Sequence, residues 1–234
     1  MSIAGRIEIL KDLEALSVQA AELIADRIRE SAGPFRLSLS GGNTPRGCYH
    51  HLAHLSRLPW EQVEIYQGDE RFVPHDDPDS NYRMIRETLL KHVAPRGVFA
   101  MPTDGTPADA AGAYEDLLRQ QYGASRLSPG RLLFDVQLLG LGEDGHTASL
   151  LPGQPVLEDR AHWVAPVPKG RDEPRLTLTY PALESSRVIL FLVSGAAKQE
   201  AMARARAGDM AIPAGRLRPQ GEVIWLADRA AAGA

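Results

Sequence analysis

Apolar residues recur along this chain at two spacings, and the two spacings alternate. In residues 11–32 they recur every three or four positions, which predicts a helix with one buried face, and Gly33-Pro34 ends it. Residues 35–39 then alternate apolar and polar side chains, as a half-buried strand does. A glycine-rich turn and a second helical pattern follow. The chain therefore begins with helix, strand, turn and helix.

The same alternation continues to the end of the chain. Further strands are expected at 63–66, 134–139, 163–167, 175–179, 188–193 and 223–226, and further helices at 81–90, 108–122 and 196–207. Strands separated by helices predict a three-layer α/β fold, with a mostly parallel sheet and helices on both faces. No repeat and no linker rich in Gly, Ser or Pro divides the sequence. We therefore expect residues 1–234 to form a single α/β domain.

Composition and charge narrow the class of protein. Of the 234 residues, 44% are hydrophobic and 24% are charged, which is ordinary for a globular protein with a substantial core. The formal net charge of −4 offers no basic excess to a nucleic-acid backbone. We therefore expect a small-molecule ligand and no nucleic acid.

Three further features bear on the cellular compartment. Cys48 is the only cysteine, so no internal disulfide can form. The first 30 residues carry several acidic side chains and lack the features of a signal peptide. No apolar run approaches the roughly 20 residues that a membrane helix needs. We expect a cytoplasmic protein without membrane association or an obligate protein partner, and the oligomeric state stays open.

The most informative motif follows the strand expected at 134–139. It reads Gly140-Leu141-Gly142-Glu143-Asp144-Gly145-His146 and presents an acid and a histidine at the carboxyl end of a strand, where open α/β folds bind ligands. Histidine titrates near neutral pH and can act as a general base, and a carboxylate can orient it. The glycines also match the dinucleotide fingerprint G-x-G-x-x-G, but Pro152 and Gly153 interrupt the helix that this fingerprint requires.

Two other strand ends carry polar groups. Ser40-Gly41-Gly42-Asn43-Thr44-Pro45 joins a strand to a helix, so its N–H groups could bind an anion and Thr44 could cap the helix or donate its hydroxyl. Gly68-Asp69-Glu70-Arg71 ends another strand, and Arg71 could bind a phosphate or carboxylate in bidentate fashion. Arg175 and Lys198 are further cations at expected edges of the same site. Each segment has a structural or solvated alternative, so the interpretation depends on their convergence.

Several other chemistries are disfavoured. The glycine turn lacks the spacing and the lysine of a P-loop, and no G-x-S-x-G motif supports a serine hydrolase. His50 and His54 lie four residues apart on an expected helix and could chelate zinc, but the sequence positions no third ligand. We therefore expect no metal site.

In order and spacing, these motifs resemble the glucosamine-6-phosphate isomerase/6-phosphogluconolactonase family, and within it the bacterial 6-phosphogluconolactonases. The matching segments are 40–45, 68–71 with Ser80-Asn81 behind it, 140–150 and 175–177, so the resemblance spans nearly the whole chain. It implies a Rossmann-like fold shared with glucosamine-6-phosphate deaminase and ribose-5-phosphate isomerase, without metal or organic cofactor. It also implies hydrolysis of 6-phospho-D-glucono-1,5-lactone to 6-phosphogluconate in the oxidative pentose phosphate pathway.

For that reaction we expect His146 to deprotonate the attacking water, with Asp144 positioning the imidazole or a sugar hydroxyl. Arg71 or glycine N–H groups would stabilise the oxyanion. The expected substrate-binding residues are Ser40, Gly41, Gly42, Asn43, Thr44, Asp69, Arg175 and Lys198. Which of the three cations binds the phosphate and which faces the carbonyl is left open.

The deaminases of the same family are the main alternative, because they resemble this chain in the glycine turn, the aspartate-glycine-histidine motif and cations matching Arg175 and Lys198. They usually have a tyrosine where this chain has Arg71, and a glutamate five residues after the histidine, where it has Leu151. Both departures favour the lactonase. A non-catalytic sugar-phosphate sensor is a lesser alternative, since the helix-turn-helix segment and basic face of such a regulator are not evident in the sequence.

Overall fold

The computed structural model describes residues 3–234 and arranges their strands in two sheets. In the larger sheet all neighbouring strands are parallel, in the order β1-β10-β9-β6-β2-β3-β5. These strands are β1 (Arg6–Leu10), β2 (Phe35–Leu39), β3 (Val63–Gln67), β5 (Gly97–Phe99), β6 (Phe134–Leu139), β9 (Ser186–Val193) and β10 (Glu222–Asp228). The smaller sheet is antiparallel and contains β4 (Asp69–Arg71), β8 (Arg175–Leu178) and β7 (Val164–Val167).

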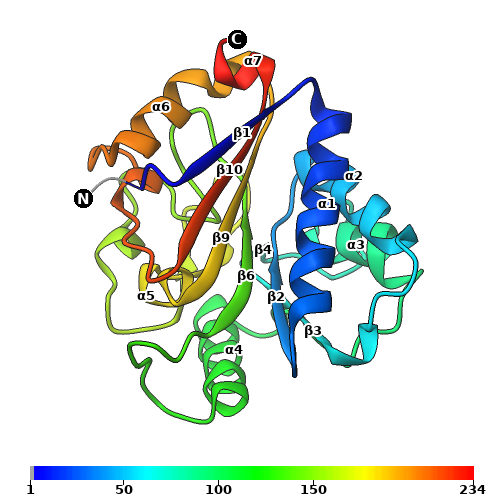
Figure 1. The fold of residues 1–234 in the computed structure, drawn as a ribbon. Helices are drawn as coiled ribbons and strands as arrows, with labels where there is room; N and C mark the ends of the chain where they lie inside the picture. The colour runs from blue at the N-terminus through cyan, green and yellow to red at the C-terminus, as the bar shows by residue number, and fades with distance from the viewer. Residues whose placement is uncertain (1–2) are drawn as a thin grey trace.

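Helices cover both faces of the larger sheet (Figure 1). One side carries α1 (Leu13–Glu30), α2 (Thr44–His54) and α3 (Asn81–Ile85), which continues as a π-helical turn (Arg86–Leu90). The other side carries α4 (Pro107–Tyr122), α5 (Tyr180–Glu184) and α6 (Gln199–Ala207) together with the smaller sheet, and α7 (Arg229–Ala232) follows β10. Among residues 3–234, no helix combines the length and the apolar character needed to span a membrane.

The buried side chains of the central strands alternate between two apolar clusters. In β9, Val188, Leu190 and Leu192 pack with α1 and α2. The intervening Ile189, Phe191 and Val193 pack with the smaller sheet and α4. This period of two places an apolar layer on each face of the sheet. The expected three-layer fold, with a mostly parallel sheet and helices on both faces, is thereby confirmed.

Three features differ from the sequence-based expectation. The strands expected at 163–167 and 175–179 do not extend the parallel sheet; as β7 and β8 they form the separate antiparallel sheet with β4. Apolar periodicity indicates a strand without indicating which sheet it joins. Strand β1 precedes α1 at a sheet edge, and its half-exposed side chains gave no clear alternation. Strand β5 spans only three residues, too few for a periodic pattern.

A buried carboxylate joins the smaller sheet to the start of α3. Glu70 of β4 is fully buried and accepts hydrogen bonds from the backbone N–H groups of Asn81 and Tyr82, both at 2.7 Å. It also accepts from the backbone N–H of Arg71 and from the side-chain amide of Gln67, both at 2.8 Å. Burial raises the pKa of Glu70, and these N–H donors oppose the rise without cancelling it. The network holds Arg71 and Asn81 at one end of the sheet.

We expect Glu70→Gln to lower the free energy of unfolding by about 2 to 3 kcal/mol, because the new amide N–H₂ would face N–H donors and leave at least one of them unpaired. Urea unfolding followed by circular dichroism measures the change. Glu22→Gln, on the exposed side of α1, is the matched control and should leave the midpoint unchanged. Equal stability of the Glu70→Gln variant and the parent would contradict a role for the carboxylate in holding β4 to α3.

Candidate active site

The candidate site lies between the neighbouring parallel strands β2 and β6, after which the chain continues to opposite sides of the sheet. β2 connects through α2 to β3 on one side of it, whereas β6 is followed by β9 and β10 on its other side. Such a change of direction opens a crevice at the carboxyl ends of the strands, where open α/β sheets bind ligands. A pocket occupies this crevice. It is lined by Ser40, Gly41, Gly42, Asn43, Thr44, Pro45, Asp69, Arg71, Asn81, Gly140, Leu141, Gly142, His146, Ala148, Arg175 and Lys198.

The pocket brings together every site residue expected from the sequence except Asp144, which contacts it through His146. Asp144 Oδ1 lies 2.6 Å from His146 Nδ1 and also accepts the backbone N–H of His146 at 3.1 Å. A proton on Nδ1 that faces Asp144 leaves the lone pair of Nε2 free. Burial raises the pKa of Asp144, but hydrogen bonds from His146 and Arg171 outweigh it and hold this pKa below its ordinary value. Asp144 is therefore a carboxylate at neutral pH.

Two glycines of the motif make this geometry possible. A Cβ on Gly142 would lie 1.9 Å from His146 Nδ1 and 2.6 Å from Asp144 Oδ1, so only glycine leaves room for the pair. Gly145 has a φ of +78°, which favours glycine, and a Cβ there would also strike Ile212. A Cβ on Gly140 would meet no atom within 4 Å. The glycines of the G-x-G-x-x-G motif thus make room for an imidazole and a carboxylate. No long helix follows the motif, so it does not form a dinucleotide-binding turn.

The glycine turn after β2 is held from both sides. The Tyr49 hydroxyl of α2 donates to the Ser40 carbonyl at 2.7 Å and accepts the Ser40 N–H at 3.0 Å. A Cβ on Gly41 would lie 1.8 Å from Asn81 Oδ1, so this side chain requires glycine opposite it. Gly42 has a φ of +95°. The turn therefore needs glycine at both positions, for close approach and for backbone conformation.

The start of α2 is open to an anion. The helix begins at Thr44, its N-cap Asn43 makes no capping hydrogen bond through its side chain, and Pro45 occupies the first turn. Of the two roles open to Thr44, capping the helix is excluded, because Thr44 is already its first residue, and donation of its hydroxyl stays a prediction. No acidic side chain lies in the first turn to offset the positive end of the helix dipole.

Two arginines face each other across the smaller sheet. Arg71 of β4 and Arg175 of β8 are direct partners in the antiparallel register, although like charges at such positions repel. Neither forms an ion pair with any residue from 3 to 234, and the Nε atom of each is buried without a hydrogen-bond partner there. Burial lowers the pKa of Arg175, Asp69 raises it and Arg71 lowers it again. The sheet therefore presents to the pocket two cations that form no ion pair within the described chain.

Other residues place the remaining polar groups. Asp69 accepts the Ser149 hydroxyl at 2.7 Å and the side-chain amide of Asn81 at 3.4 Å. The side-chain oxygen of Asn81 is buried without a partner among residues 3–234. Lys198 Nζ lies 3.5 Å from Glu143 Oε1. Asp228 holds the turn before Lys198 by accepting the Gly195 N–H at 3.1 Å.

Three residues at or beside the pocket, Ser149, Asn81 and Arg171, are not among the site residues expected from the sequence. Ser149 follows His146 too closely for a catalytic triad, and Asn81 is the first residue of the helix expected at 81–90. Arg171 was not considered. The position of Asn81 one residue after a capping serine next to a matching motif was a usable signal for it, whereas nothing in the sequence linked Ser149 to Asp69 or Arg171 to Asp144.

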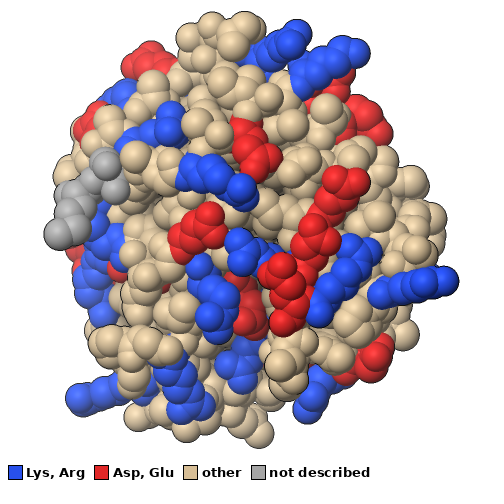
Figure 2. Space-filling view, in the orientation of Figure 1, with Lys and Arg blue, Asp and Glu red and all other residues tan. Residues whose placement is uncertain are grey.

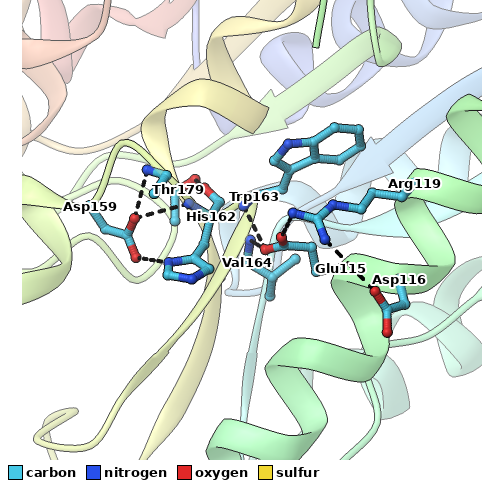
Figure 3. Close-up of polar contacts among 9 residues, drawn as sticks. Glu115, Asp116, Arg119, Asp159, His162, Trp163, Val164 and Thr179 are labelled. Carbon is cyan, nitrogen blue, oxygen red and sulfur yellow. Dashed lines mark hydrogen bonds and ion pairs between the residues drawn. The ribbon is translucent and has the colours of Figure 1, made fainter. Parts of the chain in front are cut away.

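A second aspartate–histidine pair lies outside this pocket (Figure 3). Asp159 Oδ2 is 2.9 Å from His162 Nδ1, and this hydrogen bond raises the pKa of His162. The His162 side chain is 64% exposed, against 20% for His146. Beside the pair, Glu115 of α4 accepts the backbone N–H groups at the start of β7. The Asp159–His162 pair therefore has the same chemistry as the Asp144–His146 pair but lies in a more exposed environment.

The charges and histidines elsewhere form no comparable centre. Acidic and basic side chains are interspersed on the face seen in Figure 2. The rings of His50 and His54 lie 4.5 Å apart, but residues 3–234 contain no group of three or more His, Cys, Asp or Glu placed to hold a metal ion. Cys48 is buried, and burial raises its pKa to about 12, so it is an inert thiol at neutral pH.

Comparison with known proteins agrees with these motifs. The family model described as glucosamine-6-phosphate isomerases/6-phosphogluconolactonase matches residues 11–225. A 6-phosphogluconolactonase of Nostoc sp. is 38% identical over 235 residues, which cover 96% of each chain. The structure of 6-phosphogluconolactonase from Trypanosoma cruzi superposes with a TM-score of 0.87 at 26% identity, covering 100% of this chain and 97% of that one.

A monomeric glucosamine-6-phosphate deaminase superposes almost as well, with a TM-score of 0.81 at 26% identity and coverage of 97% of this chain and 99% of that one. The two activities thus share this backbone, and only site residues can separate them. The match over residues 11–225 and the 38% identity to a curated relative decide the family. The chain belongs to the glucosamine-6-phosphate isomerase/6-phosphogluconolactonase family.

Proposed function

We propose that this protein hydrolyses 6-phospho-D-glucono-1,5-lactone to 6-phosphogluconate, with His146 as the general base that activates water. The observation that carries the proposal is the Asp144–His146 pair at 2.6 Å, beside a pocket with three cations. The pair suits attack by water, and the cations suit a phosphorylated substrate. Relatives named 6-phosphogluconolactonase, at 38% identity over nearly the whole chain, support the same reaction.

The base is prepared by its neighbours. With the Nδ1 proton directed to Asp144, Nε2 takes a proton from water as the water oxygen attacks the C1 carbonyl carbon of the lactone. The tetrahedral intermediate then expels the ring oxygen, which takes the proton back from the imidazolium. The product is the open-chain acid, which loses a proton to solvent and leaves as a carboxylate. A lactone is an activated ester, so positioning and one base suffice without a covalent intermediate.

The charged end of the substrate has a matching environment. Arg71 and Arg175 form no ion pair in the described chain, and the N-terminus of α2 offers backbone N–H groups without a competing acidic side chain. We assign the phosphate to Arg175 and the start of α2, and the oxyanion to Arg71, Lys198 or the glycine N–H groups. Asp69, which lines the same pocket, then accepts a sugar hydroxyl.

Deamination of glucosamine 6-phosphate is the second candidate, and two positions weigh against it. Leu151 stands where deaminases usually have a glutamate, and it is 5% exposed within an apolar cluster, where burial of an ionised side chain would be costly. Arg71 stands where they usually have a tyrosine. Both positions support the lactonase.

A parallel assay tests the proposed function directly. The purified protein is offered freshly prepared phospholactone and, separately, glucosamine 6-phosphate. We expect proton release from the first, measured with a pH indicator in weak buffer above the uncatalysed rate, and no ammonia from the second. Ammonia release without lactone hydrolysis would overturn the proposal.

Replacing His146 by Ala should lower kcat by about 10² to 10⁴-fold, because the general base is lost, while the Kd for 6-phosphogluconate changes little. Initial rates and titration calorimetry measure the two quantities. His162→Ala removes the imidazole of the surface pair and should leave both unchanged. Turnover by His146→Ala at the parent rate would exclude His146 from the role.

Replacing Arg175 by Gln should lower kcat/KM for the phospholactone by about 10 to 100-fold, because a charge-assisted hydrogen bond to the phosphate is lost. The unphosphorylated glucono-1,5-lactone should lose much less. Arg71→Gln and Lys198→Gln, assayed with the same two lactones, identify the cation that faces the carbonyl as the one whose loss affects both substrates equally. An equal loss on both substrates for Arg175→Gln would remove Arg175 from the phosphate site.

A further inference from the structure

One arginine outside the pocket lining contacts the aspartate–histidine pair. Arg171 Nη2 donates to Asp144 Oδ2 at 3.0 Å and lies 3.3 Å from His146 Nδ1. Asp144 is thus shared, with one carboxylate oxygen facing the guanidinium and the other facing the imidazole. No part of the hydrolysis described above assigns a role to this arginine.

Arg171 reaches the pair from the tip of a hairpin. Strands β7 and β8 are antiparallel, and their last pair before the loop is Val167 with Arg175, so residues 168–174 form the connection. Within it the chain turns tightly, since a Cβ on Gly170 would lie 1.9 Å from the Glu173 carbonyl oxygen. The side chain of Arg171 is 56% exposed. The same hairpin therefore presents a buried cation, Arg175, to the pocket and an exposed one to Asp144.

The guanidinium and the carboxylate act on the imidazole in opposite directions. Asp144 attracts a protonated His146, and Arg171, a permanent cation, repels it at 3.3 Å. Arg171 carries no acceptor, so it cannot hydrogen-bond to Nδ1 while that atom holds a proton directed to Asp144. It also draws Asp144 Oδ2 away, which keeps Oδ1 aligned with the ring. The repulsion favours a neutral imidazole, and the alignment with Asp144 Oδ1 favours the tautomer whose Nε2 is free.

We propose that Arg171 is a positioning residue that holds Asp144 in place and keeps His146 in its neutral, proton-accepting form. The role rests on the proposed function, because it matters only where His146 acts as a base. The other charged groups around the imidazole stay the same in the test below. They are Arg71, Arg175 and Lys198, which line the same pocket, Asp69 beside them, and Glu143, which pairs with Lys198.

Replacing Arg171 by Gln tests this through the pH dependence of kcat/KM. Without the cation the imidazolium is favoured, so the acid limb should move to higher pH by about 0.5 to 1 unit. Below the limb, the variant is then about 3 to 10-fold less active than the parent, and above it the two converge. Arg171→Lys keeps the charge, so the acid limb of its kcat/KM profile should lie close to the pH at which the parent shows it.

Arg187→Gln is the matched control. Arg187 forms an exposed ion pair with Asp135 at 3.4 Å, near the amino ends of β9 and β6, so its loss removes the same charge and the same kind of contact away from the pocket. Its pH profile should match that of the parent. A uniform loss of activity in Arg171→Gln at every pH, with the limb unmoved, would show a merely structural role and overturn the proposal.

A second readout separates this proposal from the proposed function. The protein has seven histidines, and the ring signal of His146 in an NMR spectrum is identified by its loss in His146→Ala. In Arg171→Gln, its titration midpoint should move to higher pH, whether or not the protein hydrolyses the lactone. An unmoved midpoint would overturn the role of Arg171 alone, and a moved midpoint without lactone hydrolysis would overturn the proposed reaction alone.

Discussion

The geometry of the pocket depends on a fully buried carboxylate that is held by N–H donors. Glu70 gathers the backbone of Arg71 on one side and the backbone of Asn81 and Tyr82 on the other. It therefore joins the smaller antiparallel sheet to the helix that covers the opposite face of the larger one. Without this connection, nothing would hold Arg71 in a defined position relative to the Asn81 side chain, which packs on Gly41. The carboxylate touches no ligand-facing surface, yet it positions two residues that do.

The pocket contains like charges whose repulsion lowers the stability of the folded protein. Arg71 and Arg175 stand opposite each other across two strands without an ion pair in the described chain, and the N-terminus of α2 adds positive potential. A folded protein tolerates such repulsion where a ligand relieves it. The surface pair of Asp159 and His162 lies away from this pocket. The pair in the pocket therefore has beside it arginines that form no ion pair within residues 3–234, whereas Arg119 near the second pair is bound to Glu115.

Most of the fold was predictable, because helix and strand differ in the period of their apolar residues. The long elements α1, α4, β6 and β9 were predicted within a few residues. The failures have different physical causes, and one of them is that local periodicity carries no information on partners. An isolated strand pattern such as that of β8 is equally consistent with a parallel or an antiparallel neighbour, and the half-exposed edge strand β1 has too little contrast to be recognised.

The fold class, the family and most of the pocket residues follow from the sequence alone, because glycines, acids and cations after successive strands meet at one edge of a parallel sheet. How these groups pair depends on the packing of the folded chain. It directs Asp144 toward His146 and Arg171, Ser149 toward Asp69, and Glu70 toward two backbone segments. Hydrogen bonds are short and directional, so they depend on the packing of segments distant in the chain, and no spacing along the sequence encodes them.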